Sequence, residues 1–376
     1  MKLIYAAQIG LFDDWAHTVQ IMKMCEAFSE NGLEVELVVP KRKNLKNLDP
    51  FVYNHTKKIF KITKLPYIDI FLGNSNPFFY WLRLVSFLVS AKTYLMFADF
   101  DILYTREIYA GLFFSNVIME RHSFPTNTRK IYKHILQKVS RIVVLTSFIK
   151  SKIVEIGIAQ DKIIVCPDAV QLEDFSNIAT IQKARTKLSL STEDFLFGYI
   201  GTLKTMGMEK GVGCAIEALN HLPSNYKLYV VGGELYDIDY YKKIAESSLV
   251  SDRVIFAGRV LHKDVPLYIS ACDALVAPFP ENEHYSYFMS PLKIFEYMAS
   301  QRPIIASDLP SLREVLTDGE TAILIPPSDA ISLAKAIQTI SVDNELAESL
   351  VKRAYDEVIK NYTWKIRAKN ILNSLK

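Results

Sequence analysis

The sequence has little of what several protein classes require, beginning with cysteine and net charge. Its four cysteines lie far apart without a C-x-x-C pair, so they indicate neither a zinc site nor a disulfide framework. They are Cys25, Cys166, Cys214 and Cys272. The formal net charge is only +3, whereas nucleic-acid binding needs a concentrated basic face. We therefore expect a protein of a reducing cytoplasm that binds no nucleic acid.

A long uninterrupted apolar run is also missing. The N-terminus, MKLIYAAQIG, has one lysine, a short apolar stretch and no cleavage site, which indicates a first β-strand instead of a signal peptide. Residues 77–98 are apolar and aromatic, but Arg83 and Lys92 interrupt them, so a membrane span is not expected. Two alternatives remain: a helix buried in a domain, or an amphipathic helix that contacts a membrane surface or a lipid acceptor. We expect a cytoplasmic protein, with peripheral contact at the inner face of the membrane as the open alternative.

Glycine is scarce where a dinucleotide-binding fingerprint would need three, because only Gly10 follows the first predicted strand. The N-terminal region instead predicts a strand at residues 3–7, a helix at 17–31 and a strand at 35–39. Units of this kind build parallel sheets, whose ligands bind beyond the carboxyl ends of the strands. The loop that holds Gly10 is therefore expected to face a cleft.

The 376 residues, of which 50% are hydrophobic and 23% charged, are enough for two domains with substantial cores. The alternation of strands and helices restarts at residues 196–201, after a polar connector. We therefore predict an α/β protein with two doubly wound, Rossmann-like domains. The N-terminal domain is expected to span residues 1–170 and the C-terminal domain residues 171–358.

Residues 290–310, SPLKIFEYMASQRPIIASDLP, carry the strongest local signal. Ser290 is a suitable N-cap and Pro291 a suitable first helical residue, so a helix is predicted to run from there to about residue 299, followed by a buried strand at 304–306. A helix N-terminus offers unpaired N–H groups to an anion, and Lys293 in the first turn adds a full positive charge. A phosphate group could bind there.

Glu296 follows Ser290 by six residues, roughly 9 Å along the helix axis at about 1.5 Å per residue. This is close to the span from a diphosphate to the ribose of a nucleotide, and a carboxylate accepts hydrogen bonds from two vicinal hydroxyls. The alternative is an ordinary amphipathic helix whose lysine and glutamate are merely solvated.

The loop GTLKTMGMEKGV, residues 201–212, follows a predicted strand of the second domain. Gly201 gives the backbone freedom at the end of the strand, while Lys204 and Lys210 place two cations before the next predicted helix. Such a loop could bind a diphosphate. A solvated surface loop is the alternative.

Two histidines lie at predicted carboxyl ends of strands in the first domain. His122 follows Glu120 after a strand at 116–119, and a neutral imidazole can hydrogen-bond a sugar hydroxyl. His17 begins the first predicted helix. Substrate contact is one interpretation of each; the alternatives are a loop histidine without a role at His122 and a helix-capping role at His17.

These segments together resemble family four retaining glycosyltransferases of the GT-B fold. The resemblance rests on SPLK and FEYMA around Glu296, on the KG pair of Lys210 and Gly211, and on residues 16–38, AHTVQIMKMCEAFSENGLEVELV. It spans nearly the whole chain and is most specific in the second half. It implies that the last helix, residues 359–376, crosses back onto the first domain.

The resemblance also implies roles for the candidate residues. The basic pair, Lys204 and Lys210, would stabilise the donor's diphosphate, and His122 would lie beside the donor sugar. The donor would otherwise bind Gly201, Arg259, Val260, Ser290, Pro291, Leu292, Lys293 and Glu296, with Glu296 on the ribose and Arg259 and Val260 at the base. The acceptor side would comprise Gly10, His17 and Glu120.

One position departs from the family's pattern of two glutamates separated by seven residues. Phe288 stands where the first glutamate is usual, and Glu283 in the preceding loop could replace it. Asp99 and Asp101 look like the Asp-x-Asp metal motif of other glycosyltransferases, but the GT-B resemblance implies no such metal, and we interpret them as solvated turn residues.

The sequence therefore predicts an enzyme that transfers a sugar from a UDP- or GDP-sugar to a hydroxyl of a saccharide or lipid-linked acceptor, with retention and without a metal or other cofactor. Cell-surface glycan or glycolipid synthesis is the expected setting. Phe288 motivates one alternative, a non-catalytic subunit that binds nucleotide sugars. A nucleotide-sugar epimerase is another, although no acid and base groups for it can be identified.

Overall fold

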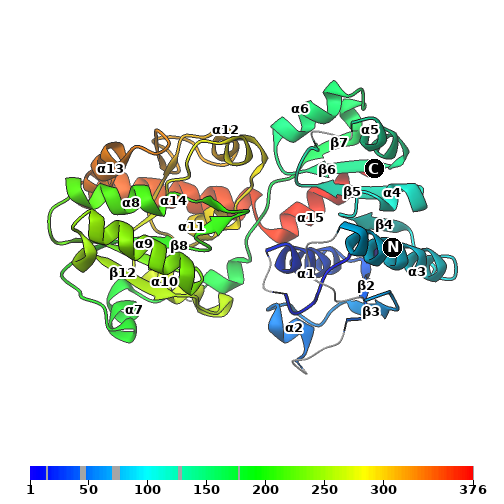
Figure 1. The fold of residues 1–376 in the computed structure, drawn as a ribbon, viewed down its shortest axis with the longest axis horizontal. Helices are drawn as coiled ribbons and strands as arrows, with labels where there is room; N and C mark the ends of the chain where they lie inside the picture. The colour runs from blue at the N-terminus through cyan, green and yellow to red at the C-terminus, as the bar shows by residue number, and fades with distance from the viewer. Residues whose placement is uncertain (14–15, 43–47, 70–76, 126–128, 177, 376) are drawn as a thin grey trace. The chain divides into compact units, whose positions relative to one another are not determined.

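A computed structural model describes residues 1–376 except 14–15, 43–47, 70–76, 126–128, 177 and 376 (Figure 1). The chain forms two compact units, which we call the N-terminal and C-terminal units. The first comprises Met1–Pro167 and Trp364–Lys376, and the second comprises Asp168–Thr363. The unit boundaries thus fall at 167/168 and 363/364, where the sequence predicted 170/171 and 358/359. The last helix belongs to the N-terminal unit.

The described part of the N-terminal unit contains a seven-stranded sheet in the order β3-β2-β1-β4-β5-β6-β7, with every pair parallel. Its strands are β1 (Lys2–Ala6), β2 (Glu34–Pro40), β3 (Lys61–Leu65), β4 (Ile102–Thr105), β5 (Val117–Arg121), β6 (Arg141–Val144) and β7 (Ile163–Val165). Its helices are α1 (Ala16–Glu30), α2 (Pro50–Tyr53), α3 (Pro77–Leu95), α4 (Ala110–Phe113), α5 (Arg129–Lys138), α6 (Ser147–Glu155) and α15 (Trp364–Asn373). Helix α15 packs against α1.

The described part of the C-terminal unit contains a six-stranded parallel sheet in the order β12-β11-β8-β13-β14-β15 and a small antiparallel hairpin, β9 with β10. The strands are β8 (Phe195–Ile200), β9 (Lys204–Thr205), β10 (Met208–Glu209), β11 (Tyr226–Val231), β12 (Val254–Gly258), β13 (Ala274–Ala277), β14 (Ile304–Ser307) and β15 (Ile323–Ile325). The helices are α7 (Ile181–Leu188), α8 (Val212–Ala218), α9 (Leu235–Ser247), α10 (Val265–Ser270), α11 (Leu292–Ala299), α12 (Pro310–Arg313), α13 (Ala330–Val342) and α14 (Asn344–Asn361), with a π-helical turn at His284–Phe288. The predicted fold class, two doubly wound parallel α/β domains, is confirmed.

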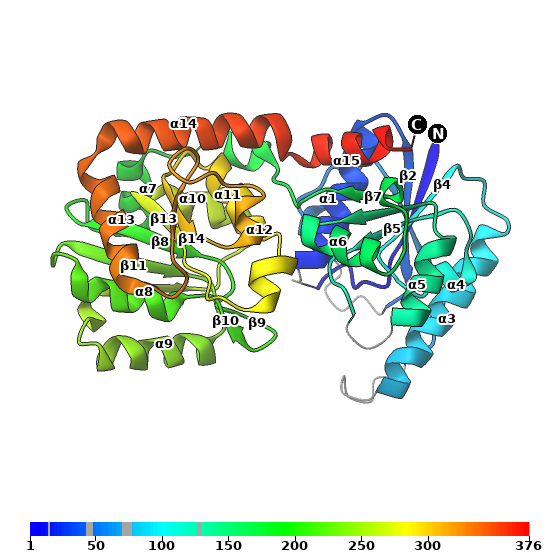
Figure 2. The same cartoon turned by 90° about the horizontal axis from the view of Figure 1, so that it is seen from above.

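Alternating side chains of the C-terminal sheet enter two separate cores, one on each face. Along β8, Leu196 and Ile200 pack in the core that α10, α11 and α14 cover, while Phe197 and Tyr199 pack in the core that α8, α9 and α13 cover. Figure 2 shows these two helix layers on opposite sides of the strands. Because both faces are covered, the central strands are apolar at successive positions, which explains the short hydrophobic runs in the sequence.

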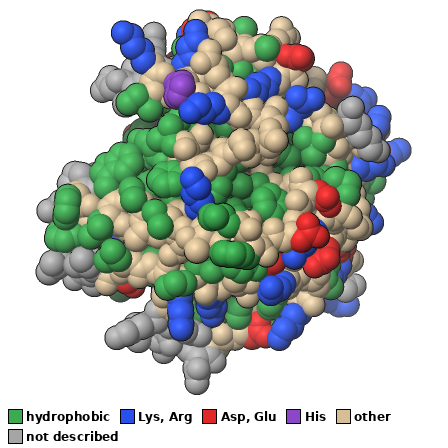
Figure 3. All heavy atoms as spheres, turned by 90° about the vertical axis from the view of Figure 1, so that its right-hand side faces the viewer, with side chains coloured by type: hydrophobic (Ala, Val, Ile, Leu, Met, Phe, Trp, Pro, Cys, Tyr) green, Lys and Arg blue, Asp and Glu red, His purple; other side chains and the backbone are tan. Residues whose placement is uncertain are grey.

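Helix α3 is packed on one side and exposed on the other. Leu84 and Leu88 pack against α4, whereas an apolar stripe at helical spacing is exposed. The stripe comprises Phe78, Trp81, Val85 and Val89, and Met96 continues it in the turn after the helix. Figure 3 shows hydrophobic side chains gathered on this face of the N-terminal unit, with lysines and arginines nearby. No helix among the described residues has the length and apolarity needed to span a membrane.

The start of α11 differs from the prediction. The helix begins at Leu292 and its N-cap is Pro291, whose ψ of 122° is extended, so no side chain caps it. Ser290 lies one residue too early to serve as the cap, and its hydroxyl instead accepts a hydrogen bond from the N–H of Asp168 at 2.8 Å. Ser290 therefore anchors the start of the C-terminal unit to the loop before α11.

Glycines allow the carboxyl ends of the central strands to approach each other closely. Gly232, at the end of β11, has a φ of +112°, and a Cβ placed there would lie 2.2 Å from the carbonyl oxygen of Gly201 at the end of β8. Residues with a side chain rarely adopt this backbone conformation. The backbones of β8 and β11 are therefore in close contact at the carboxyl end of the sheet.

We expect Gly232→Ala to destabilise the C-terminal unit strongly, because the methyl group would add a collision with the β8 backbone to the strain of a positive φ. Gly319→Ala is the matched control, since Gly319 also has a positive φ of +70° but has no atom within 4 Å of the added Cβ. Strain alone should cost about 1 kcal/mol, and Gly232→Ala should cost about 2 kcal/mol more. Urea unfolding followed by circular dichroism measures both, and equal losses would contradict the close approach.

Candidate functional site

The side chain of Lys293, in the first turn of α11, is buried with only 7% of the residue exposed. Its ammonium nitrogen lies 3.5 Å from the centre of the Tyr199 ring and 5.4 Å from that of Phe279. Among the described residues this nitrogen has no hydrogen-bond partner. It also lies at the end of β8, since a Cβ on Gly201 would be 3.2 Å from it. A buried amine without an acceptor is costly unless an anion binds beside it.

Lys210 precedes α8 and carries the second cation of this region. Its ammonium group donates a hydrogen bond to Thr202 Oγ1 at 2.7 Å, and burial lowers its pKa to about 8. The next residue, Gly211, is the N-cap of α8 in a left-handed conformation, with φ of +87°. A Cβ at Gly211 would lie 1.7 Å from the carbonyl oxygen of Pro278, so only glycine lets the chain turn there. The KG pair is thus a backbone requirement as well as a source of charge.

Lys210 and Glu296 both influence the pKa of Lys293. Burial lowers the pKa of Lys293 well below its usual value, the nearby charge of Lys210 lowers it further, and the carboxylate of Glu296 opposes the shift. Glu296 lies largely buried on α11, with its Oε1 3.3 Å from Nε2 of His262. We call these three residues the lysine cluster. Lys210 comes from the loop before α8, and Lys293 and Glu296 come from α11. The sequence analysis predicted that both segments bind the donor.

Lys204 and Arg259 pair with acidic side chains in this structure. The ammonium group of Lys204 lies 3.1 Å from Asp237 Oδ1 and over the Tyr240 ring, so α9 holds it. Arg259 Nη1 lies 2.7 Å from Glu234 Oε1, while Val260 packs against the core beside α10. The predicted donor contacts of these residues stay predictions.

The loop before α11 contributes His284, which the sequence analysis did not assign. Burial, the larger cause, and the charge of Lys210 both lower the pKa of His284. Glu283, the predicted substitute for the missing glutamate, is exposed, and Phe288 ends the π-helical turn. The sequence analysis also did not assign Thr202 and His262, because neither belongs to a motif that predicts its contact with Lys210 or Glu296.

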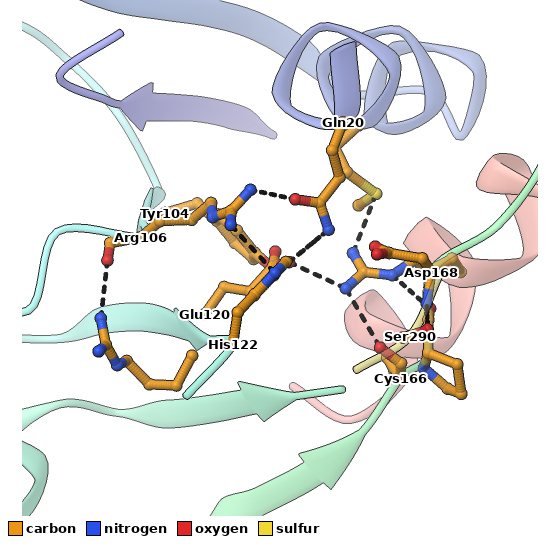
Figure 4. Close-up of polar contacts among 12 residues, drawn as sticks. Gln20, Tyr104, Arg106, Glu120, His122, Cys166, Asp168 and Ser290 are labelled. Atoms are coloured by element: carbon orange, nitrogen blue, oxygen red, sulfur yellow. Dashed lines mark hydrogen bonds and ion pairs between the residues drawn. The ribbon is translucent and has the colours of Figure 1, made fainter. Parts of the chain in front are cut away.

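A second polar group of residues lies in the N-terminal unit, around the fully buried carboxylate of Glu120 (Figure 4). Its Oε1 accepts hydrogen bonds from Arg367 Nη2 at 3.0 Å and from Gln20 Nε2 at 3.0 Å, and Tyr104 donates to Oε2. Burial alone would raise the pKa of Glu120, but Arg367 and His122 reverse this and hold it well below its usual range. We call these residues, with Arg106, the Glu120 network.

His122 is neutral in this network and both of its ring nitrogens contact the protein. Nε2 lies 2.6 Å from Glu120 Oε1, and Nδ1 lies 3.0 Å from a guanidinium nitrogen of Arg106, which also donates to Gln20. Because the arginine can only donate, Nδ1 must accept and Nε2 must carry the proton. Burial, the first cause, and the charge of Arg106 lower the pKa of His122 to about 3. A sugar contact would require one of these bonds to open.

Four residues of the Glu120 network were not assigned by the sequence analysis: Gln20, Tyr104, Arg106 and Arg367. Arg367, on α15, is the most distant of them in sequence. Its guanidinium group also donates to the backbone carbonyls of Pro167 at 2.7 Å and Cys166 at 3.2 Å. It lies 247 residues from Glu120 in sequence, so no local pattern connects the two.

The other predicted acceptor-side residues lie near the loop after β1. His17 is exposed at the start of α1, and its pKa is lowered by partial burial and by the charge of Arg106. Gly10 is buried, and a Cβ there would meet the side chains of Asp13 and Arg42. Their acceptor contacts stay predictions.

Comparison with known proteins gives a family match in the segment that carries the lysine cluster. Residues 194–343 match the family described as "Glycosyl transferases group 1". The alpha-D-kanosaminyltransferase of Streptomyces kanamyceticus is 26% identical over 186 residues, which cover 49% of this chain and 46% of that protein. The chain's match therefore spans about half the length of that relative. An uncharacterized 41.2 kDa protein in the cps region of Klebsiella pneumoniae is 26% identical over 314 residues, covering 73% of this chain and 83% of that protein.

A solved structure resembles the whole chain. The structure of Anabaena HepE in complex with UDP and glucose has a TM-score of 0.74 and 16% sequence identity, covering 100% of this chain and 99% of that one. The fold and site therefore define a protein of two Rossmann-like domains with the GT-B architecture of solved glycosyltransferases. More narrowly, the segment that carries the lysine cluster, residues 194–343, is the part of the chain that matches the Glycosyl transferases group 1 family.

Acid should destabilise the N-terminal unit in part through His122. Its pKa is about 3 in the folded unit and 6.5 normally, so its neutral form contributes stability above about pH 6.5 that is lost as the pH falls toward 3. The free energy of unfolding should fall by up to about 1.4 kcal/mol per pH unit in this range.

The variant His122→Gln should weaken this pH dependence between about pH 6.5 and 4.5, above the range where Glu120 is protonated. His134→Gln, at an exposed position of α5, is the control and should leave it unchanged. Urea unfolding followed by tryptophan fluorescence is suitable, because Trp81 and Trp364 lie in this unit. The same slope in all three proteins would show that His122 is not the titrating group.

Proposed function

We propose that this protein transfers a glycosyl group from a nucleotide diphosphate sugar to a hydroxyl acceptor. The observation that carries the proposal is the lysine cluster: a buried amine without a hydrogen-bond partner among the described residues, a second lysine near it and a carboxylate one turn along α11. Two cations suit a diphosphate, and a carboxylate suits the ribose hydroxyls. All three residues lie inside the family segment.

The chemistry that this cluster can supply is electrostatic. Loss of the nucleoside diphosphate develops negative charge on its phosphate oxygens. Lys293 is buried and Lys210 partly buried, so their interaction with that charge is less screened by water than at an exposed surface. We propose that these lysines serve in place of a metal ion. Retention of configuration follows from the resemblance to family four enzymes, and no pair of carboxylates of the hydrolase kind is invoked.

UDP- and GDP-sugars are the proposed donors. HepE was solved with UDP and glucose, and the relatives include an enzyme named for a sugar transfer and a protein of the cps region. These names support a donor of the nucleotide-sugar class and a role in the synthesis of a cell-surface glycan or glycolipid. We place the saccharide or lipid-linked acceptor at the carboxyl ends of the N-terminal strands, near Gly10, His17, Glu120 and His122.

The Lys210→Ala variant should lower the turnover of sugar transfer at least tenfold, because it removes charge from the leaving diphosphate; this equals about 1.4 kcal/mol in the barrier. The assay measures nucleotide release and glycoside formation with UDP- and GDP-sugars and a bacterial lipid-linked acceptor. Lys187→Ala, on the exposed face of α7, is the control and should retain wild-type turnover. Turnover of Lys210→Ala close to that of the control would remove Lys210 from the phosphate site.

A non-catalytic subunit that binds nucleotide sugars is the second candidate, and Phe288 in place of the usual glutamate favours it. The same assay separates the possibilities. Tight binding of a nucleotide sugar without turnover would indicate such a subunit. A changed sugar that stays attached to its nucleotide would indicate an epimerase.

We further propose that α3 contacts an anionic membrane surface when the acceptor is lipid-linked. The exposed stripe of Phe78, Trp81, Val85, Val89 and Met96 supplies apolar contact, and the exposed Lys92 at the end of the same helix complements anionic headgroups. Aromatic and basic side chains on one helix are typical of interfacial binding.

Replacing Trp81 and Val85 by serine should reduce sedimentation with vesicles of phosphatidylglycerol and phosphatidylcholine at least threefold, because about 3 kcal/mol of apolar burial would be lost. Ile331→Ser, which removes an exposed apolar side chain of the C-terminal unit, is the control. Equal sedimentation of both variants and the wild-type protein would exclude α3 as the contact.

A further inference from the structure

The Lys293 amine is the least satisfied charged group of the lysine cluster. A lysine ammonium has three N–H donors, yet here it faces the Tyr199 and Phe279 rings and has neither a hydrogen bond nor an ion pair among the described residues. The rings offset part of the desolvation of a cation, but they accept no conventional hydrogen bond. The three donors of this amine are therefore left without an acceptor among the described residues.

The charged and titratable groups that face this amine come from three elements. Lys210, from the loop before α8, repels a proton on Lys293, whereas Glu296, on α11 itself, attracts one. Tyr199, from β8, stays neutral because burial raises its pKa well above the usual value. His284 faces Lys210, and both burial and that lysine favour its neutral form. Burial and Lys210 outweigh Glu296, so the pKa of Lys293 lies well below its usual value and the free site holds the proton of this amine weakly.

We infer that Lys293 takes up a proton when the donor's diphosphate binds, so that affinity for nucleotide sugars falls as the pH rises. The proton comes from solvent and bonds to the lone pair of the amine nitrogen; no other bond is made or broken. The two negative charges of the diphosphate then supply the attraction that the free protein lacks. This inference rests on the proposed function and adds a coupling between donor binding and protonation.

The Lys293 amine also affects the stability of the protein without ligand. A buried amine without partners destabilises the folded state, and an apolar side chain of similar length removes that cost. Met is unbranched, and its sulfur makes favourable contacts with aromatic rings such as Tyr199. Lys293→Met should therefore be more stable than the wild-type protein without ligand and should gain less stability from the donor.

The first measurement is isothermal titration calorimetry with UDP-glucose and GDP-mannose, carried out in buffers of different ionisation enthalpy. Several pH values between about 7 and 9 are used, because the pKa values of Lys293 and Lys210 both lie below the usual lysine range. Both phosphates of these ligands are diesters, so they carry no titrating proton there. The wild-type protein should take up a fraction of a proton, and Lys293→Met should take up less than half as much. Lys210→Met separates the two amines, since it keeps Lys293. It should still take up part of a proton, but less than the wild-type protein, because the charge of Lys210 that lowers the pKa of Lys293 is gone.

The second measurement is the melting temperature with and without the same ligands. Lys293→Met should melt at least about 2 °C above the wild-type protein without ligand and should lose most of the shift that ligand produces. Equal proton uptake by the wild-type protein and Lys293→Met, or a less stable variant with the full ligand shift, would overturn the inference and leave the proposed function intact. Failure of the wild-type protein to bind either nucleotide sugar would overturn both.

Discussion

The cost of a buried positive charge is the constraint on which this account of the protein depends. Lys293 lies in the first turn of α11 with its amine against two aromatic rings and without a hydrogen-bond acceptor among the described residues. Chains seldom retain such a group unless something binds it, because an apolar residue of the same size would be more stable. An anion resolves the conflict. We propose a nucleotide diphosphate as that anion, because Lys210 could bind the second phosphate and Glu296 the ribose hydroxyls.

The two units treat buried charge in opposite ways. In the N-terminal unit, the Glu120 carboxylate is surrounded by donors from α1, β4 and α15 and by His122, which follows β5. The network also joins Arg367 to the backbone of Pro167. In the C-terminal unit, Lys210 and Lys293 lie beside the glycine-rich ends of the strands, and the Lys293 amine has no hydrogen-bond partner among the described residues. We interpret the Glu120 network as a fixed scaffold that keeps His122 neutral. We interpret the lysine cluster as a site whose hydrogen bonds are completed only when the substrate binds.

Much of this organisation could be predicted from the sequence because it depends on residues that are close together in the chain. Short apolar runs located the central strands, and the KG pair and the SPLK segment located Lys210, Lys293 and Glu296. Features set by distant contacts could not be found this way. Arg367 reaches Glu120 across 247 residues, and the hydroxyl of Ser290 bonds Asp168 instead of capping α11. Lys204 pairs with Asp237, a residue that no motif links to it. Strand β3, KITKL, was missed because its residues alternate only weakly and it lies at the sheet edge.

The most direct test of the central claim is a crystal structure of the protein with an intact nucleotide sugar, such as UDP-glucose, in the C-terminal unit. The account predicts that the Nζ atoms of Lys210 and Lys293 both lie within about 3.2 Å of diphosphate oxygens, with the Glu296 carboxylate at hydrogen-bond distance from the ribose hydroxyls. A diphosphate bound away from Lys293, with that amine still facing only the two rings, would contradict it.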